Sequence, residues 1–227
     1  MSLYPVAQYI FLNQAEYNRK GATALCSKQR KNIITILDSR IENYLDIFTD
    51  KPAYFMKKHS GMRPHDIAVL LKIASKGKEP WFMKDLAYEL EISASEISES
   101  INRSMIAGLI SSDKRTLRKL SLLDFLKSGL RFVYPQQPGS MVRGIGTAHS
   151  APPLNSEIVS AEQYVWPYGK GNVRGQAIKP LHPNTPEACL KDKKYYELMA
   201  LTDALRIGKV REQTIAFDMI KERIEHT

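Results

Sequence analysis

Apolar residues recur at helical spacing between residues 83 and 110. Ser93 and Ser95 both stand where a side chain could cap a helix that begins near residue 94, and Glu96 follows Ser93 at the spacing of a capping box. Gly108 suits the end of that helix, because glycine adopts the left-handed conformation at little cost. The pattern predicts two helices joined by a tight turn, followed by an extended segment. The residues expected to face inward are Leu86, Ala87 and Leu90 in the first helix and Ile97, Ile101, Met105 and Ile106 in the second.

The second of these helices leaves a polar face for solvent. Its residues are Ser95, Glu96, Ser98, Glu99, Asn102 and Arg103. Hydroxyl, amide and guanidinium groups hydrogen-bond base edges and phosphates. In a helix-turn-helix, the second helix lies in the major groove of DNA. We therefore expect Ser95, Ser98, Asn102 and Arg103 to contact double-stranded DNA.

A family resemblance rests on residues of the same segment. They are Asp85-Leu86-Ala87, Leu90, Ile92-Ser93, Ser95-Glu96-Ile97-Ser98, Arg103 and Ala107-Gly108-Leu109-Ile110. On these residues, the segment 62–135 resembles the winged helix-turn-helix of MarR-like bacterial transcription regulators, with residues 65–75 in the place of the first helix. The resemblance implies a homodimer, and two reading helices one turn of DNA apart would meet a palindromic site.

The wing of that family is a β-hairpin tipped with basic residues, and here the residues available for it are 111–119. We expect a stunted hairpin whose cations hold the flanking phosphates. These cations are Lys114, Arg115, Arg118 and Lys119.

The flanks of this segment predict further elements. Residues 27–48 carry an apolar stripe at helical spacing within an N-terminal extension, residues 1–61. This helix would either cover the winged helix or meet its counterpart in a dimer. Residues 120–130 predict another amphipathic helix, and residues 131–135 predict a strand ended by proline.

Helical periodicity disappears after residue 135, and glycine, proline and aromatic residues become more frequent. From residue 184 onward the helical pattern returns, interrupted at Gly208, which predicts a helical hairpin. Short stretches in between predict strands among turns: residues 141–144, 164–167 and 176–178.

These patterns predict an α+β fold, mostly α, in three parts. They are a helical N-terminal extension (1–61), a winged helix-turn-helix domain (62–135) and a C-terminal α+β domain that binds an effector or partner (136–227). The stretches RGIGTAHSAPPL, VWP and YYELMALTDALRIGKVRE resemble a bacterial family that joins a winged helix to a small C-terminal domain. This resemblance implies a transcription regulator, or an antitoxin beside a toxin-like partner.

The glycine-rich stretch offers a second candidate site, for a partner or an anion. Arg143 and Arg174 each precede a glycine, and Thr147 and His149 add polar groups between them. The alternative is an irregular region that folds over the winged helix. The glycines do not follow the order of a phosphate-binding loop.

Composition narrows the class of protein. A formal net charge of +9 favours polyanionic partners. The two cysteines lie far apart in sequence, and no metal-ligand spacing occurs, so neither a zinc site nor a cofactor is expected. The absence of a long apolar run or a secretory signal favours a cytoplasmic protein without a membrane partner.

Three functions were weighed against one another. The first is a sequence-specific DNA-binding regulator whose C-terminal domain senses a small molecule or a protein such as a toxin. The second is a protein-interaction platform without a direct DNA role, which Glu96 and Glu99 favour because they repel phosphate. An enzyme is not expected, since no acid/base pair or nucleophile arrangement is recognisable and the five histidines are scattered.

Overall fold

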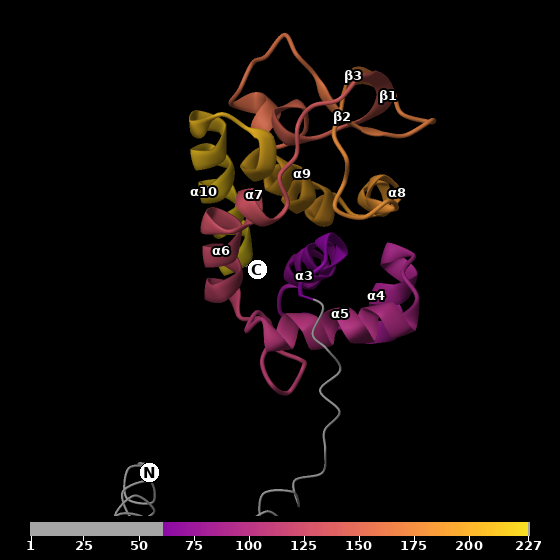
Figure 1. The fold of residues 1–227 in the computed structure, drawn as a ribbon, viewed down its shortest axis with the longest axis vertical. Coiled ribbons are helices and arrows are strands. Elements are labelled where there is room, and N and C mark those ends of the chain that lie inside the picture. The colour runs from indigo at the N-terminus through magenta and orange to yellow at the C-terminus, as the bar shows by residue number, and fades with distance from the viewer. Residues whose placement is uncertain (1–60, 227) are drawn as a thin grey trace, which may run out of the picture. The chain divides into compact units, whose positions relative to one another are not determined.

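The computed structural model describes residues 61–226 (Figure 1). The predicted helix at 27–48 and the rest of the extension 1–60 lie outside the described residues. Residues 59–227 cluster as one compact unit. Within the described part, the fold is mostly helical with one small sheet, which confirms the expected class, α+β and mostly α.

Three helices open the described chain: α3 (Pro64–Lys76), α4 (Met83–Leu90) and α5 (Ala94–Ile106). The predicted pair with its tight turn is therefore present as α4 and α5. Glu91 ends α4 in the left-handed conformation, at φ 55°. Ser93, and not Ser95, caps α5, because its hydroxyl accepts a hydrogen bond from the Glu96 backbone N–H.

A short hairpin and two helices follow: α6 (Lys119–Ser128) and α7 (Leu130–Val133). Ile110 pairs with Leu117 in an antiparallel bridge across the hairpin. The strand predicted at 131–135 is wrong, because this stretch forms a helical turn in which the Tyr134 N–H donates to the Leu130 carbonyl at 2.9 Å. Fully buried Leu130 anchors α7, while the β-favouring Phe132 and Val133 remain exposed.

Three strands form one sheet: β1 (Met141–Gly146), β2 (Tyr164–Pro167) and β3 (Val173–Ala177). The first two cover the predicted 141–144 and 164–167, but β3 begins three residues before the predicted 176–178 and ends one residue before its end. β1 pairs antiparallel with both other strands, and β2 pairs parallel with β3, so the three strands close on one another. Two short 3₁₀ turns, Ala148–Ser150 and Leu154–Ser156, lie between β1 and β2.

Three helices complete the chain: α8 (Thr185–Lys191), α9 (Lys193–Ile207) and α10 (Val210–His226). The hairpin predicted around Gly208 is present as α9 and α10. The single helix expected before it is interrupted at Asp192, whose carboxylate accepts from the Tyr195 N–H at 3.0 Å and caps α9. None of the described helices has the length and apolar content that crossing a bilayer requires.

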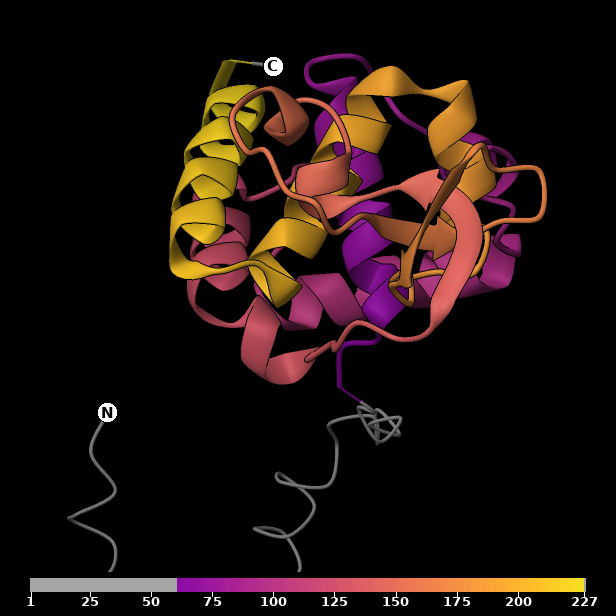
Figure 2. The same ribbon diagram turned by 90° about the horizontal axis from the view of Figure 1, so that it is seen from above.

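One continuous core joins these elements across residue 135. α9 lies in the middle of the body, packed against α3, α8 and α10 (Figure 2). Two ion pairs of the buried Lys72 of α3 reinforce this packing: its Nζ reaches the partly exposed carboxylates of Asp192 at 2.6 Å and of Glu89 in α4 at 3.0 Å. The first three helices are therefore held on the C-terminal helices, with the sheet at the opposite end of the body from α5 (Figure 1).

Candidate nucleic-acid interface

Helix α5 lies at one end of the body (Figure 1). Part of its polar face is exposed. Ile97, Ile101 and Ser104 are buried on the side that packs against α3 and α4. Ser95 is exposed, and Ser98 and Asn102 are partly exposed. These three residues therefore occupy the outward face that their spacing predicted.

The end of α5 differs from the expected inward pattern. Ile106 was expected to face inward, yet 61% of its surface is exposed. The helix stops at this residue, and Gly108 turns the chain at φ 77°. Leu109 and Ile110 then enter the core in place of Ile106, each at most 5% exposed.

The hairpin after α5 is held by the carboxylate of Asp113. This group accepts from the backbone N–H of Arg115 at 2.8 Å and of Thr116 at 3.3 Å, and from the hydroxyl of Ser111. The Ser111 bond and the backbone bonds hold the pKa of Asp113 below its ordinary value, so the charge that fixes the turn is maintained. Lys114 sits at its tip with φ 59°.

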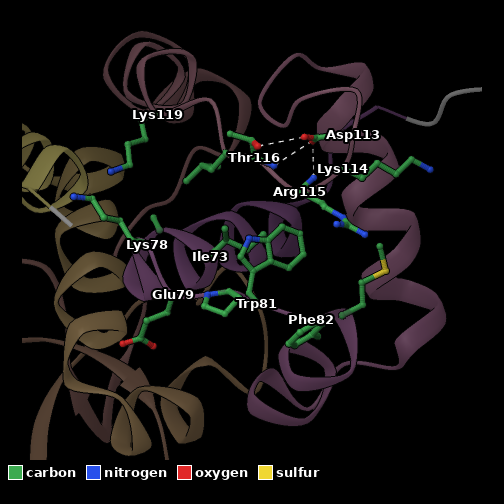
Figure 3. A pocket seen from close by; sticks show the side chains of 15 residues that line it. Ile73, Lys78, Glu79, Trp81, Phe82, Asp113, Lys114, Arg115, Thr116 and Lys119 are labelled. Atoms are coloured by element: carbon green, nitrogen blue, oxygen red, sulfur yellow. Dashed lines mark hydrogen bonds between the residues drawn. The ribbon is translucent and has the colours of Figure 1, made fainter.

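Figure 3 shows three of the four cations predicted for this hairpin, Lys114, Arg115 and Lys119, and Lys119 is the first residue of α6. Arg115 and Arg118 are exposed, and Lys114 and Lys119 are partly exposed. The hydrogen bonds to Asp113 constrain the backbone of the turn that carries these cations. The stunted hairpin that the sequence predicted is present and keeps its basic character.

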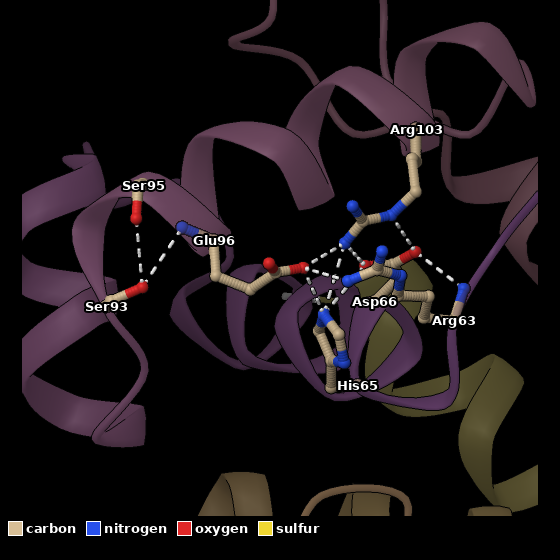
Figure 4. Close-up of polar contacts among 7 residues, drawn as sticks. All are labelled: Arg63, His65, Asp66, Ser93, Ser95, Glu96 and Arg103. Atoms are coloured by element: carbon tan, nitrogen blue, oxygen red, sulfur yellow. Dashed lines mark hydrogen bonds and ion pairs between the residues drawn. The ribbon is translucent and has the colours of Figure 1, made fainter. Parts of the chain in front are cut away.

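Arg103 is the one predicted DNA contact that the structure places inside. Its side chain is turned away from solvent and only 6% of the residue is exposed. The guanidinium donates to both oxygens of Asp66, from Nε to Oδ2 at 2.8 Å and from Nη2 to Oδ1 at 2.7 Å (Figure 4). Hydrogen bonding to Asp66 raises the pKa of Arg103. Its expected place on the outward face is therefore wrong, and the residue fastens α5 to the start of α3.

Glu96 belongs to the same network, at its partly exposed edge. Its Oε1 lies 2.6 Å from Arg103 Nη2, 2.8 Å from His65 Nε2 and 3.2 Å from Arg63 Nη1 (Figure 4). Burial alone would raise the pKa of Glu96, but the hydrogen bonds from Arg103 and His65 outweigh burial and lower it. Its negative charge is thus matched by cations on the α3 side, which weakens the repulsion of phosphate that this residue suggested in the sequence.

His65, Asp66 and Glu96 bring three metal-ligating atoms within 4.8 Å of one another. The two carboxylates already accept from the Arg103 guanidinium, and Arg63 lies against Glu96. A metal ion in this position would meet two positive side chains instead of free ligand lone pairs. The cluster therefore fits an ion-pair network better than a metal site.

The second candidate site is divided by the sheet. Arg143 and Arg174 are exposed and lie opposite each other in the β1–β3 register. Thr147 and His149 are buried: the Thr147 hydroxyl donates to Asp203 at 3.0 Å, and His149 Nε2 lies 2.9 Å from the Glu162 carbonyl. The structure brings the two arginines together and separates them from the other two residues.

The sequence analysis missed a buried polar cluster around Asp203. This carboxylate accepts from the Trp166 indole N–H at 2.6 Å, from the Arg206 guanidinium at 2.6 Å and from Thr147. Burial raises the pKa of Asp203, and Arg206 opposes that effect. The cluster joins Thr147, which directly follows β1, to β2 and α9. An aspartate within the apolar stretch LMALTDAL, followed by an arginine at i+3, was the available signal.

Comparison of the chain with protein-family models, with curated proteins and with solved structures found no match.

Proposed function

We propose that this protein is a sequence-specific DNA-binding transcription regulator. In this proposal, α3, α4, α5 and the hairpin that follows form a winged helix-turn-helix, and α5 enters the major groove. The observation that carries it is that exposed or partly exposed polar residues of α5 and the exposed or partly exposed cations that follow it belong to neighbouring segments of the chain. Figure 1 shows α5 and the hairpin at the same end of the body.

The two groups of side chains have different tasks. Ser95, Ser98 and Asn102 of α5 read base edges, for which hydroxyl and amide groups are suited. The hairpin cations Lys114, Arg115, Arg118 and Lys119 hold phosphates, which fixes the register of α5 and supplies much of the affinity. Arg103 takes no part in this contact set, because it holds α5 on α3.

The regulator acts as a homodimer on a palindromic site. One α5 contacts a single half-site, and two copies with reading helices roughly 34 Å apart would meet successive turns of the same groove face. A dimer also multiplies the discrimination that three short side chains provide in one copy, since each half-site adds its own contribution.

Selection of duplexes from a random library tests the proposal. The full chain should enrich a palindromic sequence. Replacement of Asn102 by Ala should relax the preference at one position of each half-site by about 1–3 kcal/mol. Arg174→Ala, which removes an exposed side chain from the sheet, is the control and should retain the preference. Failure to bind any duplex at low salt would rule the proposal out.

A protein-interaction role is the second candidate, in which the same module is a platform for a partner such as a toxin. Large apolar side chains at its surface favour this role: Tyr88 of α4 is 85% exposed and Ile106 of α5 is 61% exposed. An antitoxin that represses its own gene would combine both roles. Binding of a protein partner with no duplex binding at low salt would favour this candidate alone.

A further inference from the structure

A pocket of about 670 Å³ lies between the α3–α4 connection and the hairpin, and neither proposed DNA contact set explains it. We call it the Trp81 pocket, after the indole in its middle (Figure 3). Ile73 and Ala74 of α3 line one wall, and residues 113–117 line the other. Its volume falls in the range of pockets that bind small molecules.

The lining combines an aromatic surface with positive charge. Trp81 is partly buried and Phe82 is 58% exposed, so ring faces are available to a ligand. Two carboxylates, Glu79 and Asp113, also line the pocket, and Asp113 is committed to the hairpin through its hydrogen bonds. The cations of the lining outnumber them: Lys78, Lys114, Arg115 and Lys119.

The placement of these groups indicates a ligand with a ring and more than one negative charge. Lys78 and Lys119 lie on one side of Trp81 in Figure 3, and Arg115 lies on the other. A flat ring stacked on the indole would have cations on both sides. A phosphate chain carries several negative charges and can pair with more of these cations than a single carboxylate can. A purely apolar ligand would leave the cations without a partner.

We propose that the Trp81 pocket binds a nucleoside phosphate and that this ligand opposes DNA binding. The second half rests on the proposed function, because Lys114, Arg115 and Lys119 belong both to the pocket and to the phosphate contacts of the hairpin. A cation that binds the nucleoside phosphate cannot bind a DNA phosphate at the same time. The nucleoside phosphate and DNA therefore each lower the affinity of the protein for the other by the same factor.

The test of the first half uses the full chain and its two tryptophans. Trp166 is fully buried, so a ligand stacked in the pocket quenches the fluorescence of Trp81. We expect saturable quenching by ATP, with adenosine and inorganic tripolyphosphate binding at least about tenfold more weakly. Absence of saturable ATP binding would overturn the proposal, and so would equal binding of ATP and tripolyphosphate.

Variants locate the binding site. Lys78→Ala and Trp81→Leu should each weaken ATP binding about tenfold by calorimetry, because each removes one of the two interactions. Lys78 is exposed, so its replacement leaves a folded chain even if the tryptophan variant does not fold. The double variant Arg143→Ala/Arg174→Ala should bind ATP as the parent does. Unchanged affinity in Lys78→Ala would overturn the assignment.

Displacement of a labelled duplex tests the second half. Saturating ATP should raise the apparent Kd of the duplex about tenfold, within the usual range of coupling between sites. Simultaneous binding without mutual effect would overturn the opposition. ATP binding without duplex binding would rule out the proposed function and the opposition but keep the ligand site. Duplex binding without ATP binding would rule out the ligand site and the opposition but keep the proposed function.

Discussion

The α5 end and the sheet end of the molecule both display exposed arginines, yet their surroundings differ. At the α5 end, Arg115 and Arg118 lie beside a helix with an open polar face. At the sheet end, Arg143 and Arg174 face each other across two strands, while the neighbouring polar residues are buried around Asp203. Exposed charge alone therefore does not distinguish a DNA-binding surface. In the function proposed above, the adjacent polar helix is what separates the α5 end from the sheet end.

The buried arginine at the α5 end gives the largest expected effect. Arg103→Met leaves the fully buried Asp66 without its bidentate partner, and we expect a loss of about 3–5 kcal/mol in the free energy of unfolding. Urea denaturation measures it. The exposed Arg118→Met is the matched control, with a change within about 0.5 kcal/mol. An unchanged denaturation midpoint for Arg103→Met would contradict the burial of Arg103 against Asp66.

The sheet end has a comparable internal contact with a smaller expected effect. Trp166→Phe keeps a buried ring but removes the N–H that donates to Asp203 at 2.6 Å. Because hydrogen bonds to charged groups are worth about 1.5–3 kcal/mol, we expect a loss of that size in unfolding free energy. Duplex affinity of the folded variant should match that of the parent. A loss of affinity at constant stability would show that the sheet end contacts DNA.

The positions of several helices could be predicted from the sequence, but the buried polar contacts at the two ends could not. Apolar periodicity located α4, α5 and the C-terminal hairpin, because each buries one stripe against a neighbour. The burial of Arg103 depends on Asp66, which lies 37 residues away in the chain. No local pattern contains such a partner. Asp203 and Arg206 are neighbours on one helix, but the other two donors to Asp203, Thr147 and Trp166, lie 56 and 37 residues away in the chain, so the sequence did not reveal the full cluster.

The cap of α5 gives the next expected effect. Ser93→Ala removes the oxygen that accepts from the Glu96 N–H and should cost about 1 kcal/mol of unfolding free energy. Ser95→Ala is the comparison, because the sequence offered it as an alternative cap; its hydroxyl lies 3.1 Å from the Ser93 hydroxyl, so this variant should lose that contact but keep the cap. Thermal denaturation of the two variants decides between them. A larger loss for Ser95→Ala would show that Ser95, and not Ser93, caps α5.

The two ends should also respond to pH in opposite directions, which is the smallest effect. Glu96 has a pKa lowered from its ordinary 4.5, despite burial, by Arg103 and His65, so its contribution to stability is complete above pH 4.5 and is lost as pH falls through the lowered value. Burial raises the pKa of Asp203 above 3.8, so its contribution is lost as pH rises through the raised value. Denaturation from pH 7 to about pH 3 should show a shallower acid-side decline for Glu96→Gln and a steeper one for Asp203→Asn. Identical profiles would contradict both assignments.

The most direct test of the central claim compares two pairs of exposed arginines. Duplex affinity is measured across a range of salt concentrations for the parent, for Arg115→Ala/Arg118→Ala and for Arg143→Ala/Arg174→Ala. Both variants remove two positive charges, so a general effect of net charge is the same in each. We expect the hairpin pair to reduce the slope of log affinity against log salt by about 1.8 and the sheet pair to leave it unchanged. Equal slopes for the two variants, or a loss confined to the sheet pair, would contradict the account.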